Sequence, residues 1–127
     1  SSDVRQASVA ALGELSERGD ADVVSMLVAK LRDPDADVRR SAAAVLGAVA
    51  ELGCHSAIAA LRVRLADPSP VVREMAIRTL SDLAEVDGAT VSHVCLRLQD
   101  ASPDVRLAAV VALGRAAAGC STEAALA

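Results

Sequence analysis

Hydrophobic residues recur at helical spacing within a block that returns along the chain. In the clearest copy, Val38, Ala42 and Leu46 follow one another at intervals of four residues, which places them on one face of a helix. An Arg follows the opening Val directly, and a Gly or Ser follows the Leu. The opening Val stands at Val4, Val38, Val72 and Val105, with spacings of 34, 34 and 33 residues. A fixed period of this size is typical of a stacked-repeat protein.

Each repeat predicts two helices joined by a short turn. Asp35, Ser69 and Ser102 suit the N-cap of the first helix, and Pro70 and Pro103 suit its first turn. We expect this helix, helix A, at about residues 2–17, 36–51, 70–85 and 103–117, and the second, helix B, at about residues 21–32, 55–66 and 89–99. The glycines expected to end helix A in a left-handed conformation are Gly19, Gly53, Gly88 and Gly119.

Both helices carry a stripe that is predicted to be buried. On helix A it comprises Val38, Ala42, Val45, Leu46 and Val49, with the equivalents Val4, Ser8, Ala11, Leu12 and Leu15; Val72, Ala76, Thr79, Leu80 and Leu83; and Val105, Ala109, Ala112, Leu113 and Ala116. On helix B it comprises Val24, Leu27, Val28 and Leu31; Ile58, Leu61 and Leu65; and Val91, Val94, Cys95 and Leu98, with Arg62 at the edge. A mid-helix Gly costs about 1 kcal/mol against Ala. Its recurrence after the Leu predicts a close crossing with a neighbouring helix.

Composition supports an all-α fold and narrows the class of partner. The 127 residues include no Phe, Tyr or Trp, and 28 of them are Ala. The formal net charge of −4 argues against a nucleic-acid surface, and without an apolar run of membrane-spanning length we expect no membrane contact. The chain has three Cys, an odd number, and does not need disulfide bridges for stability. Reduced thiols and a cytoplasmic location are therefore predicted.

The repeats divide the chain at about residues 1–34, 35–68, 69–101 and 102–127, the last one truncated. We expect them to form a single domain over residues 1–127. Neither end presents the polar outer face that terminal repeats need, so a segment of a longer array, or ends that pack on something else, is expected.

The pattern of Asp, then Val-Arg, then Ala, Leu and Gly along one helix resembles the HEAT repeat. It is most similar to the short subclass named after the phycobilisome lyases, whose units read roughly D-x-x-x-x-V-R-x-x-A-x-x-A-L-G. Ser8 in place of Ala and Ser81 in place of Gly depart from it. The resemblance implies a right-handed α-solenoid, an armadillo-like superhelix of about three and a half helix pairs, with the B helices on the concave side.

Two sets of charged residues recur with the repeat. Asp33–Arg39, Asp67–Arg73 and Asp100–Arg106 share a six-residue offset across the turn between repeats. We interpret them as a structural ladder in which each Arg donates to turn carbonyls and to Asp within or between repeats; a charged ridge for a partner is the alternative. The second set, Lys30, Arg64 and Arg97, forms a column on helix B, with His93, Arg62 and Arg32 nearby. This set is a candidate track for an acidic segment of a partner, against the alternative of a solvated helix face.

Catalytic and metal motifs are not found. The sequence has no Gly-rich phosphate loop, no GxSxG and no HExxH. Cys54–His55 and His93–Cys95 lack the ligand spacing of a zinc site, and Cys95 is expected to be a small core residue. We therefore predict no cofactor and no catalytic residue.

The sequence as a whole predicts a non-enzymatic scaffold that binds a protein partner along the B helices. Two alternatives stay open. One is an accessory of a chromophore lyase, which the subclass resemblance suggests, and the other is a structural spacer within a large assembly.

Overall fold

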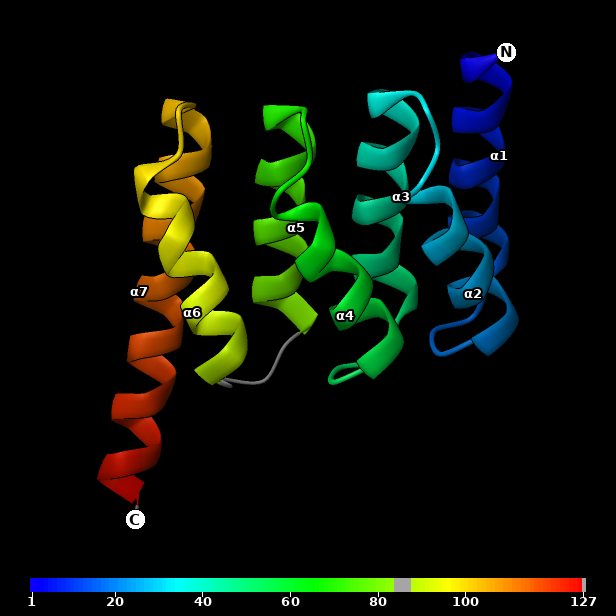
Figure 1. The fold of residues 1–127 in the computed structure, drawn as a ribbon. Helices are drawn as coiled ribbons and strands as arrows, with labels where there is room; N and C mark the ends of the chain where they lie inside the picture. Colours follow the sequence, from blue (N-terminus) through cyan, green and yellow to red (C-terminus); the bar gives the residue numbers. More distant parts are fainter. Residues whose placement is uncertain (84–87, 127) are drawn as a thin grey trace.

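The computed structural model describes residues 1–83 and 88–126, with side chains described to residue 119. Over these residues the chain is helical and contains no strand. The helices, labelled in Figure 1, are α1 (Ser2–Leu15), α2 (Ala21–Lys30), α3 (Ala36–Val49), α4 (His55–Arg64), α5 (Pro70–Leu83), α6 (Gly88–Leu96) and α7 (Pro103–Leu126), with a 3₁₀ turn, η1 (Arg97–Gln99), after α6. The expected helices A and B are thereby confirmed through the third repeat, with ends that differ by one to three residues.

The helices form two rows. Helices α1, α3, α5 and α7 stand side by side in one row, here called the A row, and α2, α4 and α6 cross them in a second, the B row (Figure 1). Each A helix contacts the next A helix, and each B helix packs against the A helix of the following repeat: α2 on α3, α4 on α5, and α6 on α7. This is the predicted all-α solenoid, in which no repeat has a core of its own.

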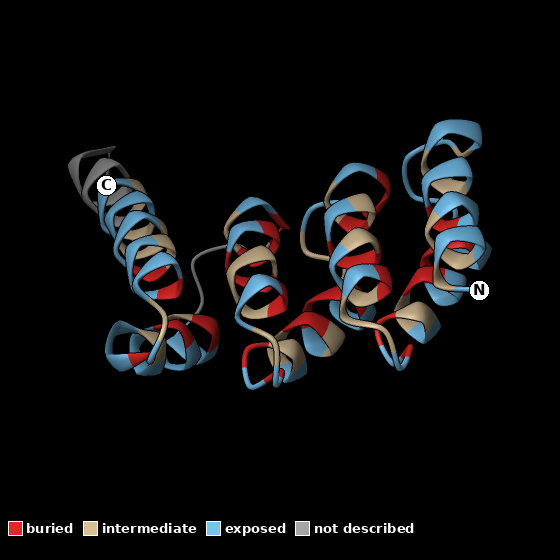
Figure 2. Ribbon diagram, turned by 90° about the horizontal axis from the view of Figure 1, so that it is seen from above, coloured by how far each residue is buried: buried red, intermediate tan, exposed pale blue. Residues whose placement is uncertain are grey.

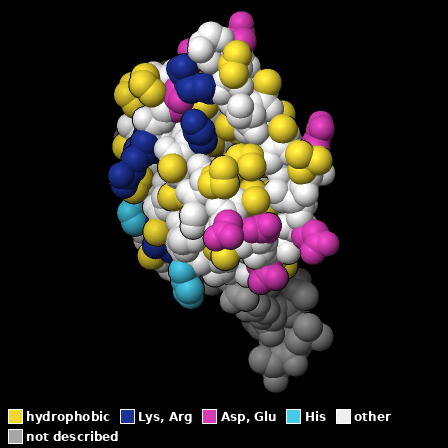
Figure 3. Space-filling view, turned by 90° about the vertical axis from the view of Figure 1, so that its right-hand side faces the viewer, with side chains coloured by type: hydrophobic (Ala, Val, Ile, Leu, Met, Phe, Trp, Pro, Cys, Tyr) yellow, Lys and Arg dark blue, Asp and Glu magenta, His cyan; other side chains and the backbone are white. Residues whose placement is uncertain are grey.

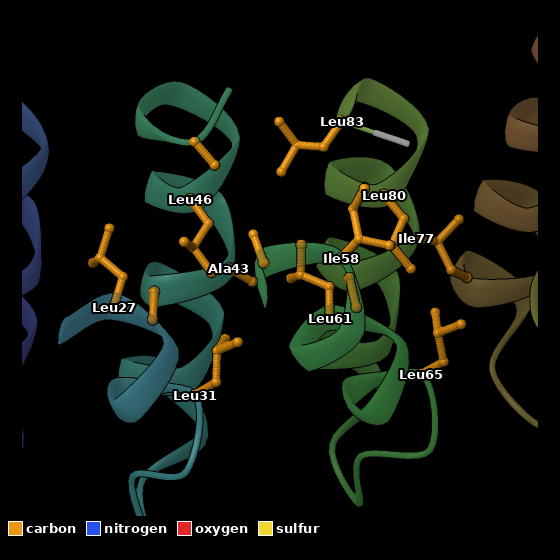
Figure 4. Close-up of a cluster of buried hydrophobic side chains, with 14 of the residues drawn as sticks. Leu27, Leu31, Ala43, Leu46, Ile58, Leu61, Leu65, Ile77, Leu80 and Leu83 are labelled. Carbon is orange, nitrogen blue, oxygen red and sulfur yellow. The ribbon is translucent and has the colours of Figure 1, made fainter. Parts of the chain in front are cut away.

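The hydrophobic core runs as a continuous layer between the two rows. Buried residues face inward from both rows along the stack (Figure 2). Leu27 and Leu61 from the B row meet Leu46 and Leu80 from the A row, and all four are fully buried (Figure 4). Because the layer consists mainly of aliphatic side chains and has no aromatic one, the helices can approach closely.

In the first repeat, the predicted buried stripe of helix A is wrong. Val4, Ser8, Ala11 and Leu15 are exposed, whereas Val9 on another face of α1 is fully buried. The stripe of an A helix faces the preceding repeat, and among the described residues no helix precedes α1. Val9 is buried because it faces the following helix, α3.

On α6 the predicted stripe also needs correction. Cys95 is exposed rather than in the core, and Leu98 is exposed in η1. Thr90 is buried at the position of Val23 and Ala57. The last turn of this B helix is 3₁₀, which rotates its final residues away from the stripe that Leu31 and Leu65 occupy.

Two of the four turn glycines have the expected conformation. Gly19 and Gly53 have φ of +87° and +76°, in the left-handed region. Their backbone N–H groups donate to the carbonyls of Val49 and Leu83 in the next A helix, at 2.7 and 2.8 Å. The turn of each repeat is therefore tied to its neighbour as well as to its own helix.

The prediction is wrong for the other two turn glycines. Gly88 is the first residue of α6 and so lies inside helix B instead of in the turn before it. Gly119 lies within α7, which continues to Leu126 instead of ending near residue 117. Among the described residues no A helix follows α7, so none accepts the N–H of a turn residue there. The expected fragment of a fourth helix B, and the side chain of Cys120, lie outside the residues whose side chains are described, as do positions 84 and 85 at the expected end of helix A.

The mid-helix glycines sit where neighbouring A helices cross. A Cβ on Gly13 would lie 2.8 Å from Cγ1 of Val45, and one on Gly47 would lie 3.3 Å from Cγ2 of Thr79. At the third crossing the Gly position is Ser81, and its counterpart on α7 is the smaller Ala112. The departure of Ser81 from the repeat pattern is thus matched by a loss of volume opposite it.

We predict that Gly13→Ala and Gly114→Ala change stability in opposite directions. At Gly13, crowding against the stiff Val45 should outweigh the better helix propensity of Ala and destabilise the chain by about 1–2 kcal/mol. At Gly114 an added Cβ meets nothing within 4 Å, so the same change should stabilise by up to about 1 kcal/mol. Urea denaturation of the two variants measures both values. Equal stabilisation by both substitutions would contradict the close crossing.

Candidate functional site

The recurring Arg and Asp residues form a ladder along one edge of the stack, in which Arg5, Arg39 and Arg73 each reach the Asp of the following repeat. Arg39 donates through Nε and Nη2 to the two carboxylate oxygens of Asp67, at 2.9 and 3.0 Å. Arg73 binds Asp100 in the same way, at 2.8 and 2.9 Å. Arg5 binds Asp33 at 2.8 and 3.3 Å. A planar guanidinium fits a carboxylate in this two-point manner, which fixes the offset between neighbouring repeats.

The six-residue offset seen in the sequence corresponds to the predicted bonds from each Arg to the turn carbonyls. Nη1 of Arg39 donates to the backbone carbonyls of Asp33 and Pro34, at 2.9 and 3.0 Å. Arg73 and Arg106 make the equivalent bonds to the turn carbonyls before their own helices. Each internal ladder Arg therefore joins its own turn to the carboxylate of the next turn.

The ladder carboxylates stay ionised at neutral pH because their hydrogen bonds outweigh their burial. Burial raises the pKa of Asp67, but the guanidinium of Arg39 and the backbone N–H of Ser69 lower it by a larger amount. The net pKa therefore lies below its usual range. The pKa of Asp100 is lowered in the same way, by Arg73 and the N–H of Ser102. In turn, the hydrogen bond to Asp67 raises the pKa of Arg39.

The cations of the proposed partner track lie next to this ladder. Arg64 donates to Asp67 at 3.1 Å, and Nη1 of Arg97 lies 3.5 Å from the carboxylate of Asp100 and donates to the carbonyl of Leu65 at 3.2 Å. Nε of Arg97 is buried and makes no hydrogen bond. The pKa of Asp33 is lowered chiefly by the backbone N–H of Asp35 and then by Arg5, and Lys30, at the same helical position as Arg64, adds a smaller lowering. The column is thus partly engaged inside the stack.

The other two residues of the proposed track differ in their setting. Nε of Arg62 donates to the hydroxyl of Thr90 at 3.1 Å, which links α4 to α6. His93 is exposed on α6, with Nδ1 2.6 Å from the carbonyl of Ala89 one turn earlier. Arg62 and His93 therefore lie on successive B helices, and only His93 is fully open to solvent.

The sequence analysis missed two of the three exposed apolar side chains beside the column, Val63 and Leu96. Val63 and Leu96 occupy one helical position on α4 and α6 and are 60% and 64% exposed, and Met26 on α2 is 51% exposed. Each of Val63 and Leu96 directly precedes a column cation. The sequence could have revealed them, because Val63 and Leu96 recur at one helical position that lies outside the buried stripe of helix B.

Charge is unevenly distributed between the two rows. The B helices with the residues that follow them, 21–32, 55–66 and 88–99, contain five cations and one carboxylate, a net charge of +4 in a chain whose net charge is −4. Figure 3, which looks at the α1–α2 end of the stack, shows Lys and Arg gathered along one edge and hydrophobic side chains in the middle of that end. The B row is therefore the basic, weakly apolar side of an acidic protein.

No helix among the described residues has the length and apolar character needed to cross a lipid bilayer. Neither of the two described cysteines is in a disulfide: Cys54 is the N-cap residue of α4 and is partly exposed, with Sγ 3.5 Å from the hydroxyl of Ser56, and Cys95 is exposed. Within the described part of the chain, His, Cys, Asp and Glu do not gather in a group that could hold a metal ion.

We predict that Asp67→Asn destabilises the chain by about 2–3 kcal/mol at pH 7, because Arg39 and Arg64 lose a buried charged acceptor. The lowered pKa of Asp67 stabilises the fold at pH values above the usual pKa of 3.8, and that contribution is lost as the pH falls through the lower pKa of the folded state. Unfolding by urea at several pH values should thus show a shallower acid dependence in the variant than in the original chain.

Asp104→Asn is the matched control, because Asp104 is exposed in the first turn of α7. It should change stability by less than about 0.5 kcal/mol. An equally large effect at both positions would show that the ladder adds nothing beyond a surface charge.

Comparison with known proteins agrees with this architecture. The sequence profile described as HEAT repeats matches residues 1–81 and, in an overlapping second match, residues 24–114. None of the curated proteins matches the chain. The matches extend over most of the sequence and include the Val-Arg signature of every repeat, so the chain belongs to the HEAT-repeat family.

Proposed function

We propose that the chain is a non-enzymatic binding module that holds a protein partner along the exposed face of the B row. The observation that carries the proposal is the row of solvent-exposed Met26, Val63 and Leu96 on three successive B helices. Val63 and Leu96 stand at equivalent positions, and Met26 lies about one turn before the equivalent residue of α2, Ala29. Large exposed aliphatic side chains on successive helices favour an interaction surface over a solvated face.

The charges around this row support a partner with an acidic segment. Lys30, Arg62, Arg64 and Arg97 border the apolar side chains, and His93 lies beside Leu96 on α6. An apolar centre with a cationic border combines burial of aliphatic surface with electrostatic steering of an anionic partner. HEAT repeats generally mediate protein–protein interaction, which agrees with this proposal.

We also propose that further units, or other partners, pack on the two ends of the stack. Val4 and Leu15 on α1 are 64% and 87% exposed, while their equivalents Val38 and Val49 are buried. At the other end, Arg106 binds its turn carbonyls but, among the described residues, has no carboxylate like those that Arg39 and Arg73 bind.

Site-specific photocrosslinking tests the proposed face. A benzoylphenylalanine at position 63 or 96 should give crosslinked adducts with a partner in an extract of the native source. The control position is Val71, which is 43% exposed at the start of α5 in the A row and should give none. Val63→Glu should reduce the adduct formed at position 96, because it places a carboxylate in the apolar row.

Two results would oppose the proposal. Equal adducts at position 71 would show that the B row has no special role. Adducts confined to position 15, on the end of the stack, would favour the structural-spacer alternative.

A further inference from the structure

Each step of the ladder, meaning the turn between two repeats, places two cations beside one buried Asp. At the second step, Arg39 and Arg64 both bind Asp67. At the third step, Arg73 and Arg97 face Asp100. The ladder therefore presents a positive charge that recurs once per repeat.

The first step has the same balance with different residues. Arg5 binds Asp33, Lys30 lies near it, and Asp35 adds a second carboxylate in the turn, where the later repeats have Ser69 and Ser102. Arg32, which is exposed, supplies the additional cation. Two cations beside one buried Asp are thus kept at all three steps, while the exposed Asp37 and Asp104 lie in the first turns of the helices that follow the first and third steps.

From this regular arrangement we infer that the acidic segment of the partner is extended, with a carboxylate at every third residue. Packed helices are spaced by about 10 Å. A polyproline II segment advances about 9 Å in three residues and returns to the same face, so its carboxylates match successive steps. In a β-strand the third residue points to the opposite face, so the match is lost.

The position of the cations favours a narrow, extended occupant. Lys30 and Arg64 are the last residues of α2 and α4, and Arg97 follows α6 directly. The row therefore runs along the ends of the B helices, beside the exposed Val63 and Leu96, and not across their centres. A single extended segment can bring one carboxylate to each step while a neighbouring apolar side chain contacts Val63 or Leu96. This inference rests on the proposed function and specifies the partner's chemistry.

The probe is a fluorescently labelled nine-residue peptide, Glu-Pro-Ala repeated three times, titrated with the intact chain and followed by anisotropy. It should bind at least about fivefold more tightly than a peptide of the same composition with its three Glu adjacent, because only the first places one charge-assisted contact at each step. Binding should weaken as salt rises from 50 to 200 mM.

Lys30→Gln and Arg64→Gln should each weaken binding by about threefold to tenfold. The matched control is Arg78→Gln on α5, where Arg78 is 65% exposed and pairs with Glu74 in the A row, and it should leave binding unchanged. Thermal unfolding of each variant separates lost contacts from lost folding.

Three results would overturn the inference. They are equal affinity for the two peptides, tighter binding of a helical peptide with Glu at every seventh residue, and equal affinity for single-stranded oligothymidylate. If any of these appears while crosslinks at positions 63 and 96 persist, the B row still binds a partner and the extended acidic segment is wrong. Loss of the crosslinks as well would remove the proposed function itself.

Discussion

An A helix of this chain can bury its apolar surface only when another A helix lies on each side of it. The comparison of Val4 with Val38 and Val72 shows the constraint directly, since the same residue at the same register is 64% exposed on α1 and fully buried on α3 and α5. Helix pairs of this size have too little apolar surface to fold alone. Stacking is therefore the source of the core, and the remaining contacts set how the repeats are aligned.

Alignment depends on the ladder and on the glycines. The two-point bonds from Arg39 to Asp67 and from Arg73 to Asp100 fix the offset of one repeat on the next. Gly13 and Gly47 allow the A helices to approach, and the N–H groups of Gly19 and Gly53 attach each turn to the following helix. Thr79 adds a buried bond from its hydroxyl to the carbonyl of Ala43 on α3, at 3.0 Å. Small side chains and directional bonds thus replace the bulky aromatic residues that the chain lacks.

The same arrangement produces the candidate binding surface. The Asp residues of the ladder are buried, and most other carboxylates lie in the A row and the turns. The B row is therefore left with a net positive charge. The stripe of each B helix faces α3, α5 or α7, so the residues on the opposite side, among them Val63 and Leu96, are exposed. A rigid stack repeats this surface at a constant spacing, and regular spacing is what a solenoid offers to an elongated partner.

The sequence by itself determined the repeat, the helix pairs and the residues that recur. The reason is that helical spacing depends on residues close together in the chain, and the same spacing is present in every repeat. It identified Arg39 and Asp67 as members of one recurring set, and it located the close crossings at Gly13 and Gly47. Only the tertiary structure decided that Arg39 reaches the Asp of the next repeat, since that depends on how far one hairpin is displaced against another. It also decided that Leu15 and Cys95 are exposed and that α7 continues through Gly119. Burial and helix termination at these positions depend on a neighbouring helix, which a repeat pattern does not specify at the ends of a stack.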